Sequence, residues 1–599
     1  QFGDSVTEDR KQDMVTLLKE YTWLNTSCKP ETLNNGTYHV TNYNEAKDML
    51  ERIEQMVSLA QEVQNDVPDD LQAAYYQLVY FPAVASATVA KIQIYSGLNT
   101  YYYEKNMVCA NIYAAQLKTA IQEDKNLQSE YNNAMPGVED KWKNMMSSPH
   151  VGFVTWNSEG WKYPEIKWYQ PDETSTMIVG LEGQSEIYTE GTASLSDFTS
   201  VNKESYTVDL SNQGVKPFTY EVKASADWIK LSDVSGYITM HDSFHISVDW
   251  SKVAQDSEGT VTITGAGKTV IVPIKAKVTD TAGLAEKTYI YENGYASIAA
   301  GNFTKRESGA NGETFEVICD YGKMGDSLKA FPSNRSFVDD VTKAPYVEYT
   351  VSVPEAGTYK LTTYTAPSNN VDRNSVTIRY AVAANGGEPQ LINSINENNY
   401  EAGAYSGTWT TDVKANGRST ESELTLRAGI NTIQYYAADP GFVLQKAVVS
   451  KESIKNSHFG PKESYYVGKT VSEISDTISE KQLIHSMPGQ IVASDYEGSS
   501  RNGESVTVKE GEEYTYPVIV SEGATYEFEV GASSEEGAVL QLLWGKRVVG
   551  SVQVDATGGT FAIDGTIKLG TIKNSITVKV TSGQAKLDYI KINKSDTSN

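Results

Sequence analysis

The spacing of the apolar residues changes from helical to strand-like near residue 150, and this change constrains the fold more than any other feature of the sequence. In residues 44–68 the apolar positions follow the i, i+3, i+4 spacing of one buried helix face, at Ala46, Met49, Leu50, Ile53, Met56, Val57, Ala60 and Val63. After residue 170 the alternation has a period of two and turn residues recur every few positions. The expected fold class is multidomain α plus all-β: a helical bundle followed by β-sandwiches.

The helical part is expected to fill residues 1–150. Apolar residues between positions 14 and 24 mark a first helix, and Asn42 with Glu45 resembles a capping pair that starts a second, which Pro68 ends. A third helix is expected over 69–96 with a kink at Pro82, and a fourth over 99–130, after Gly97. These helices predict a bundle.

The strand-like part is expected to form three sandwiches. Residues 172–280 resemble an immunoglobulin-like sandwich in their short strands and frequent turns. Three blocks then recur in the same order, which indicates a diverged internal repeat. The matched blocks are YASIAAGNFTKRE with GQIVASDYEGS, EAGTYKLTTYTA with EGATYEFEVGAS, and GINTIQYYAADPGFVLQKAVV with KNSITVKVTSGQAKLDYIKI. They predict two jelly-roll-like sandwiches, at 285–455 and 480–595, joined by a linker over 456–479.

Composition excludes several classes of partner. A formal charge of −26 leaves no basic face for nucleic acid, and no basic run is present for anionic lipid. No apolar run is expected to be long enough to span a bilayer. The chain starts at Gln1 without a leader, so it is expected to be a mature form or a fragment, and its 38 tyrosines suit a secreted or extracellular β-rich protein, with a cell-surface or periplasmic place as alternatives.

Metal ions, cofactors and a catalytic nucleophile are not expected. Cys28, Cys109 and Cys319 are odd in number and far apart, so core thiols are the simplest interpretation. His241 and His245 have a spacing found in zinc sites, but their flanks are strand-like rather than helical. There is no nucleophile elbow and no phosphate-binding glycine loop. We therefore assign no catalytic residue, no metal ligand and no cofactor.

Sugar binding requires exposed aromatic faces beside hydrogen-bonding loops. Trp409 and Trp544 are the candidates in the two jelly-roll-like sandwiches, and each can equally be a packing residue. Tyr496, Arg501 and Asn502 form a weaker set near the start of the last sandwich.

Residues 151–171 form an aromatic-rich junction between the helical and strand-like parts, and the stretch NMMSSPHVGFVTW, residues 144–156, runs into it. His150 and Trp156 lie in or beside it. A histidine without a neighbouring carboxylate or nucleophile is more often a core residue, and a tryptophan cluster at a change of period is more often interdomain packing. The junction is therefore interpreted as packing first, with a substrate-pocket wall as the alternative.

Several blocks together resemble the C-terminal half of glycoside hydrolase family 115, the xylan α-1,2-glucuronidases. They are Lys29-Pro30-Glu31, QLVYFPAVAS, the stretch that holds Lys141, Trp142, Met145, Met146, His150, Gly152 and Trp156, the set Trp409, Val413, Asn416 and Arg418, and the closing motif Asp439-Pro440-Gly441. The last sandwich resembles carbohydrate-binding modules of families 6 and 35, through PGQIVASDY and LDYIKI.

The resemblance implies a hydrolase that removes glucuronate or 4-O-methylglucuronate branches from glucuronoxylan. The family's catalytic carboxylates lie in an upstream barrel that this chain is expected to lack, so none can be assigned to a residue here, and the chain is expected to be inactive alone. In a complete enzyme the resemblance places the barrel beside the bundle, where His150 or Trp156 could face the substrate.

Both β-sandwich stretches that correspond to the opening of the binding modules depart from the module pattern. The modules open with Glu-Ala-Glu around a structural calcium ion, whereas the matching stretches here read AAG at 299–301 and VAS at 492–494. Asp588 alone is a poor calcium site, because that ion takes six or more oxygens. The 285–455 sandwich is expected to be the family's C-terminal domain and the 480–595 sandwich a binding module.

The expected function is therefore polysaccharide binding and structural support within a secreted xylan α-glucuronidase. The alternative is a non-catalytic polysaccharide-binding adhesin or scaffold protein. The sequence does not determine the polysaccharide, the binding faces or the oligomeric state.

Overall fold

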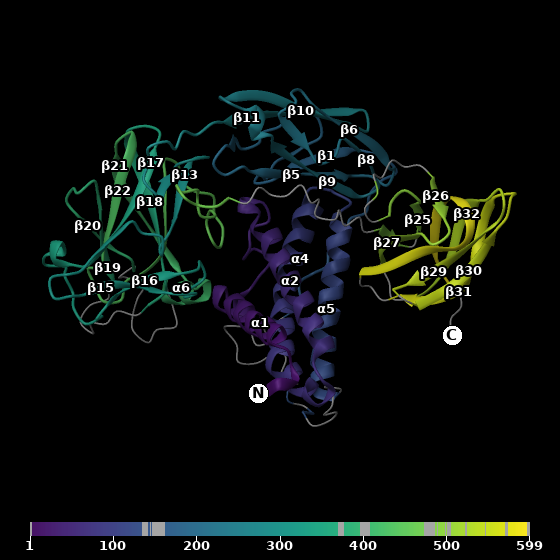
Figure 1. Ribbon diagram of the computed structural model, residues 1–599, viewed down its shortest axis with the longest axis horizontal. Helices are drawn as coiled ribbons and strands as arrows, with labels where there is room; N and C mark the ends of the chain where they lie inside the picture. The colour runs from purple at the N-terminus through teal and green to yellow at the C-terminus, as the bar shows by residue number, and fades with distance from the viewer. Residues whose placement is uncertain are drawn as a thin grey trace.

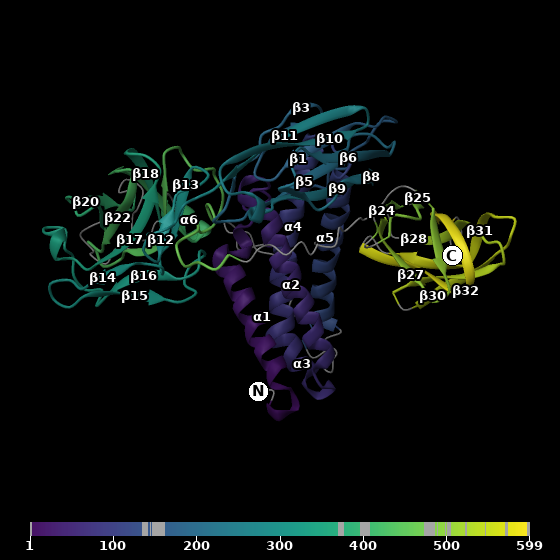
Figure 2. The same cartoon turned by 45° about the horizontal axis from the view of Figure 1, so that its top comes forward.

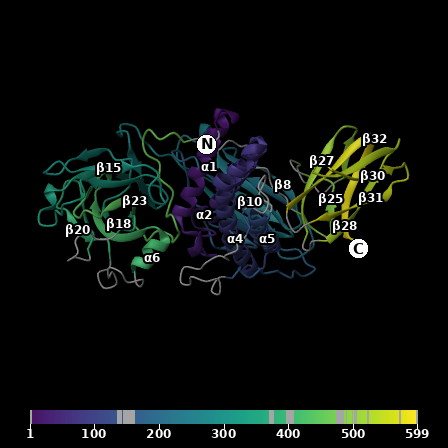
Figure 3. The ribbon, with the colours of Figure 1, turned by 90° about the horizontal axis from the view of Figure 1, so that it is seen from below.

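The computed structural model describes residues 3–133, 142, 143, 145, 162–368, 377–395, 408–471, 485–487, 489–496, 499, 505–520, 524–545, 547–569 and 573–595. The predicted fold class is confirmed: a helical bundle is followed by β-sandwiches (Figure 1). We call these the bundle (α1–α5), the first sandwich (β1–β11), the second sandwich (β12–β23 with α6) and the third sandwich (β24–β32). The first sandwich caps one end of the bundle, and the other two lie on opposite sides of it (Figures 1 and 3).

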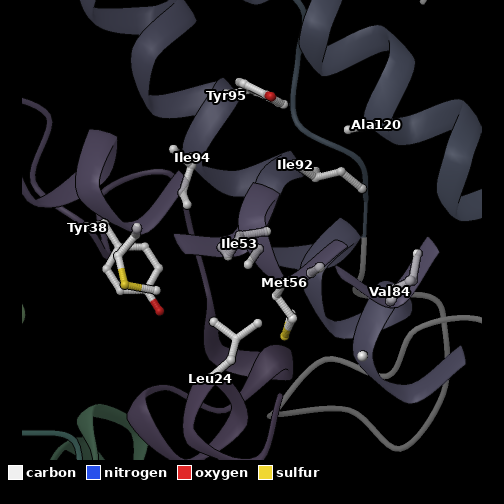
Figure 4. Packing of buried hydrophobic residues seen from close by; sticks show 14 of the residues in the cluster. Leu24, Tyr38, Ile53, Met56, Val84, Ile92, Ile94, Tyr95 and Ala120 are labelled. Atoms are coloured by element: carbon white, nitrogen blue, oxygen red, sulfur yellow. The ribbon is translucent and has the colours of Figure 1, made fainter. Parts of the chain in front are cut away.

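The bundle is built from four long helical segments, α1 (Glu8–Ser27), α2 (Glu45–Asp66), α3–α4 (Gln72–Tyr75 and Phe81–Glu104) and α5 (Ala110–Asn133). Thr7 caps α1, because its side chain accepts a hydrogen bond from the backbone N–H of Arg10. Helix α2 buries the predicted apolar face, and residues such as Ile53 and Met56 meet Leu24 of α1 and Val84 of α4 in one core (Figure 4). Helix α4 is buried nearly all round, as expected of the central helix.

The central helix is longer than the sequence predicts. A π-helical turn, Tyr76–Tyr80, joins α3 to α4 just before Pro82, which stands in the first turn of α4. Proline has no backbone N–H to donate, and the wider π-helical turn accommodates the missing hydrogen bond. The expected break at Gly97 is wrong, because α4 continues through it. The residue is glycine for a different reason: an added Cβ would lie 2.5 Å from the backbone oxygen of Asn35.

This continuity also corrects the expectation about membrane spans. The helical stretch Asp69–Glu104 is long and apolar enough, by length and composition, to cross a membrane. Of its most apolar window, 56% is buried inside the protein. The same apolarity is what a central helix needs when it packs against α1, α2 and α5 (Figure 2).

The first sandwich has two facing sheets. One has the order β2-β1-β5-β9-β7 and the other β3-β11-β10-β6-β8, with β4 paired to β11. Alternate residues of β9 and β11 are buried, as a two-sided strand requires. Its strands are β1 (Met177–Leu181), β2 (Ile187–Tyr188), β3 (Gly191–Thr192), β4 (Phe198–Thr199), β5 (Ser205–Asn212), β6 (Phe218–Ala224), β7 (Ile229–Leu231), β8 (Ser235–Ile238), β9 (His241–Val248), β10 (Ser257–Gly265) and β11 (Lys268–Lys277).

The second sandwich also has two sheets, in the orders β12-β17-β22-β19-β20 and β15-β16-β23-β18-β21. Strand β14 pairs with β17, and β13 pairs with β23. Its elements are β12 (Thr288–Ile290), β13 (Tyr295–Ala299), β14 (Lys305–Glu307), β15 (Thr314–Ile318), β16 (Ser327–Phe331), β17 (Tyr346–Val353), β18 (Gly357–Thr365), β19 (Arg379–Ala384), β20 (Gln390–Asn393), α6 (Thr408–Ala415), β21 (Arg418–Leu426), β22 (Gly429–Tyr436) and β23 (Val443–Ser450).

The third sandwich is organised by one long strand, β32 (Lys573–Lys594). Its first half pairs with β27 and β29, and its second half pairs with β25, β26 and β28. The other strands are β24 (His485–Met487), β25 (Gly489–Val492), β26 (Val506–Lys509), β27 (Glu513–Val520), β28 (Ala524–Ser533), β29 (Ala538–Trp544), β30 (Arg547–Val554) and β31 (Gly559–Leu569).

The three repeated sequence blocks occupy equivalent strands in the second and third sandwiches. The first block supplies β13 and β25, and the second supplies β18 and β28. Both strands of each sandwich pair with its last strand, β23 or β32, which the third block supplies. The internal repeat is therefore a repeat of topology as well as of sequence.

The chain leaves the bundle in an extended segment that two asparagines hold. Asn99 of α4 bonds both backbone groups of Lys167, at 2.8 and 2.9 Å, and Asn111 of α5 bonds both backbone groups of Tyr169, at 3.0 and 2.8 Å. Trp168 packs beside Ala115 of α5. The described part of the predicted junction is thus packed along the bundle.

Replacing Gly97 by alanine distinguishes close packing from helix propensity. Propensity alone predicts a gain of about 1 kcal/mol in unfolding free energy. The contact with the Asn35 backbone predicts a loss of about 1–3 kcal/mol. We expect the loss, measured by urea unfolding with far-ultraviolet circular dichroism, which reports mainly on the bundle. Ser58→Ala, at an exposed position of α2, is the control and should leave stability nearly unchanged. A more stable Gly97→Ala protein would contradict the packing assigned to this glycine.

Candidate carbohydrate-binding surfaces and interdomain contacts

Trp544, one of the two predicted sugar platforms, ends β29 beside a tight turn and pairs with Arg547 across it. Its ring is half-buried and packs against the core of the third sandwich. Leu540 and Leu542 of the same strand are fully buried, and alternation places Trp544 on their side of the sheet. The ring therefore closes one end of the core and leaves one part accessible.

Tyr496 belongs to a second aromatic group at the edge of the same core. Its ring packs edge-on against Tyr514, with 4.9 Å between the ring centroids, and lies 6.5 Å from Tyr516. The hydroxyl of Tyr514 donates to Glu512 at 2.6 Å, and burial raises the pKa of this phenol. Tyr516 is fully buried and donates to the backbone oxygen of Ala493.

Strand register relates the two aromatic groups. On β32, Ile576 stands opposite Tyr516 of β27 on one side and Trp544 of β29 on the other. Residues aligned across neighbouring strands point to the same face, and two strand spacings are about 10 Å. The structure thus brings Tyr496 and Trp544 to the rim of one core.

Trp409, the other predicted platform, lies in the first turn of α6, and its side chain lies outside the described part of the structure. The far end of α6 contacts the bundle: the Lys414 backbone oxygen accepts from Thr32 at 3.4 Å, and the Asn416 side chain donates to the Thr26 backbone oxygen. Helix α6 is therefore an interface element. His150, Trp156, Arg501 and Asn502 lie outside the described residues and remain predictions.

The contact between the bundle and the second sandwich centres on the buried carboxylate of Glu45, at the start of α2. One of its oxygens accepts from the backbone N–H groups of His39 and His458, each at 2.9 Å. The other accepts from the N–H of Phe459 at 2.6 Å. The predicted capping pair of Asn42 with Glu45 is wrong, because no side chain caps α2 and Glu45 binds a segment more than 400 residues away.

The segment bound by Glu45, residues 457–461, is held from its other side by the second sandwich. Lys446 of β23 donates from Nζ to the carbonyl oxygens of Phe459 and Pro461, at 2.8 and 2.7 Å. The segment thus offers its N–H groups to the bundle and its carbonyl groups to the sandwich. It forms a bonded layer between the two, which we call the clamp segment.

Aromatic stacking adds to these hydrogen bonds. The ring of Phe459 lies between Trp23 of α1 and Tyr38, with 5.8 Å from its centroid to each of theirs. The guanidinium of Arg52 lies 3.4 Å from the centroid of the Trp23 ring. Stacked aromatic pairs contribute about 0.5–1.5 kcal/mol each beyond their burial.

Buried ionisable groups surround the clamp segment. Burial lowers the pKa of Lys323 and of Lys446 to about 8. Burial, followed by the charge of Lys323, lowers the pKa of His458 to about 3, so the ring is neutral at ordinary pH and donates from Nε2 to the Ser27 backbone oxygen at 2.8 Å. Both oxygens of Glu45 are occupied by backbone donors, which suits a structural joint better than acid–base catalysis.

A second, partly buried joint binds the bundle to the first sandwich. Lys47 of α2 pairs with Asp209 of β5 at 2.7 Å, and His241 of β9 lies 3.2 Å from the same carboxylate. Burial opposes ionisation of Asp209, but Lys47 and His241 together lower the pKa of this carboxyl below its usual range. The pair is partly buried, with side-chain exposures of 29% for Lys47 and 16% for Asp209, and it fixes how the two surfaces meet.

The candidate metal ligands named from the sequence have other partners in the part of the chain that the structure describes. No group of three or more His, Cys, Asp or Glu side chains there could hold a metal ion. His245 lies 3.4 Å from the Thr207 hydroxyl, and Asp588 accepts a hydrogen bond from Ser505 at 2.6 Å. Cys28 and Cys109 are buried as expected, whereas Cys319 is exposed, which corrects its interpretation as a core thiol.

Models of two known families match parts of the second and the first sandwich. Residues 288–463 match the model of the glycosyl hydrolase family 115 C-terminal domain, and residues 189–279 match the viral BACON domain. The second sandwich with its clamp segment therefore matches the C-terminal domain of a glycoside hydrolase family, as the sequence predicts. No curated protein matches the sequence.

Solved structures similar to parts of the chain include an enzyme and two binding modules. The enzyme is a family 115 4-O-methyl-α-glucuronidase with specificity for decorated arabinogalactans, at 11% identity and a TM-score of 0.38, covering 74% of this chain. The chain spans 40% of that enzyme's length. A family 35 module from Clostridium thermocellum (20% identity, TM-score 0.18) and a family 6 module of a laminarinase from Zobellia galactanivorans (13%, 0.18) each match over 26% of the chain, and over 97% and 99% of their own lengths.

Removing the charge of Glu45 should release the clamp segment. Glu45→Gln places an amide N–H₂ group against backbone donors, and a hydrogen bond to a charged group is worth about 1.5–3 kcal/mol. We expect a loss of about 2–4 kcal/mol in unfolding free energy and faster cleavage between β23 and residue 471 in limited proteolysis. Glu62→Gln, an exposed change on the same helix, is the matched control. Unchanged cleavage and stability in Glu45→Gln would show that the clamp does not hold the domains together.

The buried His458 makes stability depend on pH. Its pKa is about 3 in the folded protein against an ordinary value of 6.5, so between these values only the unfolded chain binds the proton. The contribution is complete above pH 6.5 and is lost as the pH falls toward 3. From pH 6.5 to pH 5 the native protein should lose about 1.5 kcal/mol more than His458→Gln, which cannot titrate. Urea unfolding at a series of pH values measures this difference, and parallel curves for the two proteins would contradict it.

Proposed function

We propose that this chain is the C-terminal portion of a secreted xylan α-1,2-glucuronidase, in which it binds polysaccharide and supports the catalytic part. The observation that carries the proposal is the match of residues 288–463 to the family 115 C-terminal domain, on a sandwich that Glu45 joins to the bundle. The substrate class is glucuronoxylan, from which the complete enzyme would remove glucuronate or 4-O-methylglucuronate branches.

Two joints between domains support the proposed structural role. Glu45 and Lys47 attach the second and first sandwiches to the same end of α2. A catalytic part that packs against the bundle would therefore meet a surface whose domains are fixed relative to one another. In that complete enzyme His150 and Trp156 are the proposed contacts to the substrate pocket, and the upstream barrel is the proposed partner.

The binding role is proposed for the third sandwich, with Trp544 and Tyr496 as its aromatic contacts and Arg501 and Asn502 as polar ones. The rings of Trp544 and Tyr496 are half-buried at the rim of one core, so each keeps part of its face accessible. Sugar C–H groups stack on such faces, and neighbouring polar side chains bind the hydroxyls. Trp409 is the corresponding candidate on the second sandwich.

Affinity electrophoresis of the full chain tests this function. Gels that contain glucuronoxylan, a decorated arabinogalactan or dextran are compared, and we expect retardation by glucuronoxylan and not by dextran. Trp544→Ala and Tyr496→Ala should each weaken retention by about tenfold. Trp544→Phe, which keeps the apolar packing, separates lost binding from lost folding. Tyr103→Ala, at an exposed tyrosine of the bundle, is the control and should bind normally.

Two outcomes would overturn parts of the proposal. Equal migration in all gels would contradict polysaccharide binding. Release of free glucuronate from glucuronoxylan by this chain alone would contradict a supporting, non-catalytic role. Retention by several unrelated polysaccharides would instead favour the non-catalytic adhesin or scaffold protein.

A further inference from the structure

A cavity of about 450 Å³ lies where the bundle, the first sandwich and the second sandwich meet. The turn before α2 supplies Tyr43 and Asn44, and the first sandwich supplies two stretches around residues 182 and 204. The start of the second sandwich, 292–295, and the stretches 452–455 and 462–464 complete the lining. Its volume falls in the range of sites for small molecules.

The walls of this junction cavity are bonded to one another across the domains. The Tyr43 hydroxyl accepts from the backbone N–H of Lys455 at 3.1 Å, and Lys455 donates from Nζ to the Gly183 carbonyl oxygen at 2.6 Å. On the opposite side, the Asn293 amide donates to Glu204 at 3.3 Å. Three domains thus share one bonded wall, and the cavity is preformed.

Three residues of the cavity lining have left-handed backbone. Tyr43, Asn44 and Asn293 have φ values of 56°, 55° and 50°, in the left-handed region that side chains disfavour. All three line the cavity. Such conformations persist only where the surroundings enforce them, and they gather at ligand sites. Asparagine adopts this region readily, so the strain falls on Tyr43, whose hydroxyl accepts the hydrogen bond from the N–H of Lys455.

The lining has the chemistry of a neutral sugar site. Tyr43, Tyr206 and Tyr295 contribute aromatic rings, and Tyr43 and Tyr295 pack edge-on with 6.2 Å between centroids. Amide and hydroxyl groups come from Asn202, Asn293 and Ser464. Sugar C–H faces stack on rings, while sugar hydroxyls exchange hydrogen bonds with amides, hydroxyls and carboxylates.

The charges around the cavity disfavour an acidic sugar. Five glutamates line it (Glu182, Glu204, Glu292, Glu452 and Glu463), against two lysines. Lys455 donates to the Gly183 carbonyl oxygen and Lys462 is paired with Asp48 at 2.5 Å, so both ammonium groups already have partners. Burial raises the pKa of Glu204 and Glu292, which any added anion would raise further. A metal ion is also disfavoured, because the described carboxylates form no group able to hold one.

We propose that the junction cavity binds a neutral mono- or disaccharide unit of a polysaccharide main chain and discriminates against uronic acids. This site is separate from the rim of the third sandwich, so it goes beyond the proposed function and can fail while that function holds.

Isothermal titration of the full chain with xylobiose, galactobiose and glucuronic acid tests the proposal. We expect at least one neutral disaccharide to bind, and glucuronic acid to bind at least about tenfold more weakly. Ser453→Trp places a large side chain at the cavity and should weaken neutral binding by about tenfold or more. Ser453→Ala is the matched control, because both variants lose the 2.6 Å hydrogen bond from Lys360. It should bind within about twofold of the native protein.

A second variant keeps the test informative if the introduced tryptophan turns to solvent or prevents folding. Asn293→Gly removes the amide while glycine adopts the same positive φ without strain, and it should also weaken neutral binding. Circular dichroism confirms that each variant is folded. Affinity electrophoresis of Ser453→Trp on glucuronoxylan should show retention by the third sandwich unchanged.

The proposal is overturned if neither neutral disaccharide binds, if glucuronic acid binds as tightly as they do, or if both cavity variants bind normally. A calcium titration that shows binding lost in Ser453→Trp but not in Ser453→Ala would overturn it as well, because the occupant would then be a cation.

Discussion

The carboxylate of Glu45 is the interaction on which the arrangement of the bundle and the second sandwich depends. Burying a charge is costly unless its hydrogen-bonding capacity is satisfied, and three backbone N–H groups satisfy this one. Two of the three donors belong to the clamp segment, so the charge is tolerated only while that segment is in place. Folding of the start of α2 and docking of the second sandwich are therefore coupled.

The clamp segment is stabilised by opposite charges on its two sides. Glu45 accepts from its N–H groups, while Lys446 donates to its carbonyl groups. The low pKa of Lys446, about 8, shows that its burial is only partly offset, so the ammonium form is held at some cost. Phe459 adds apolar contact between Trp23 and Tyr38, which limits access of water to these bonds. Hydrogen bonds are stronger in such a setting, and an unpaired group there is correspondingly costly.

The sequence predicts the local elements well and the long-range contacts poorly. The apolar spacing of α2 identifies its buried face, and the internal repeat identifies strands that prove topologically equivalent. The predictions for Gly97 and Glu45 are wrong for a common reason: each residue has a local role that its type suggests and a distant partner that spacing does not reveal. Trp544 illustrates the same limit, since its position at the rim of a core depends on the pairing of β29 with β32.

The two joints together explain why the junction is rigid. Glu45 and Lys47 are two residues apart on α2, so the helical period points them to opposite sides, toward the second and the first sandwich respectively. The turn that precedes them, with Tyr43 and Asn44 at positive φ, is fixed by the same contacts and faces the junction cavity. A ligand that enters there meets walls already ordered during folding, and the entropy that flexible walls would lose on binding is avoided. At the junction cavity this order comes from two sandwiches that are fixed to the same end of one helix of the bundle.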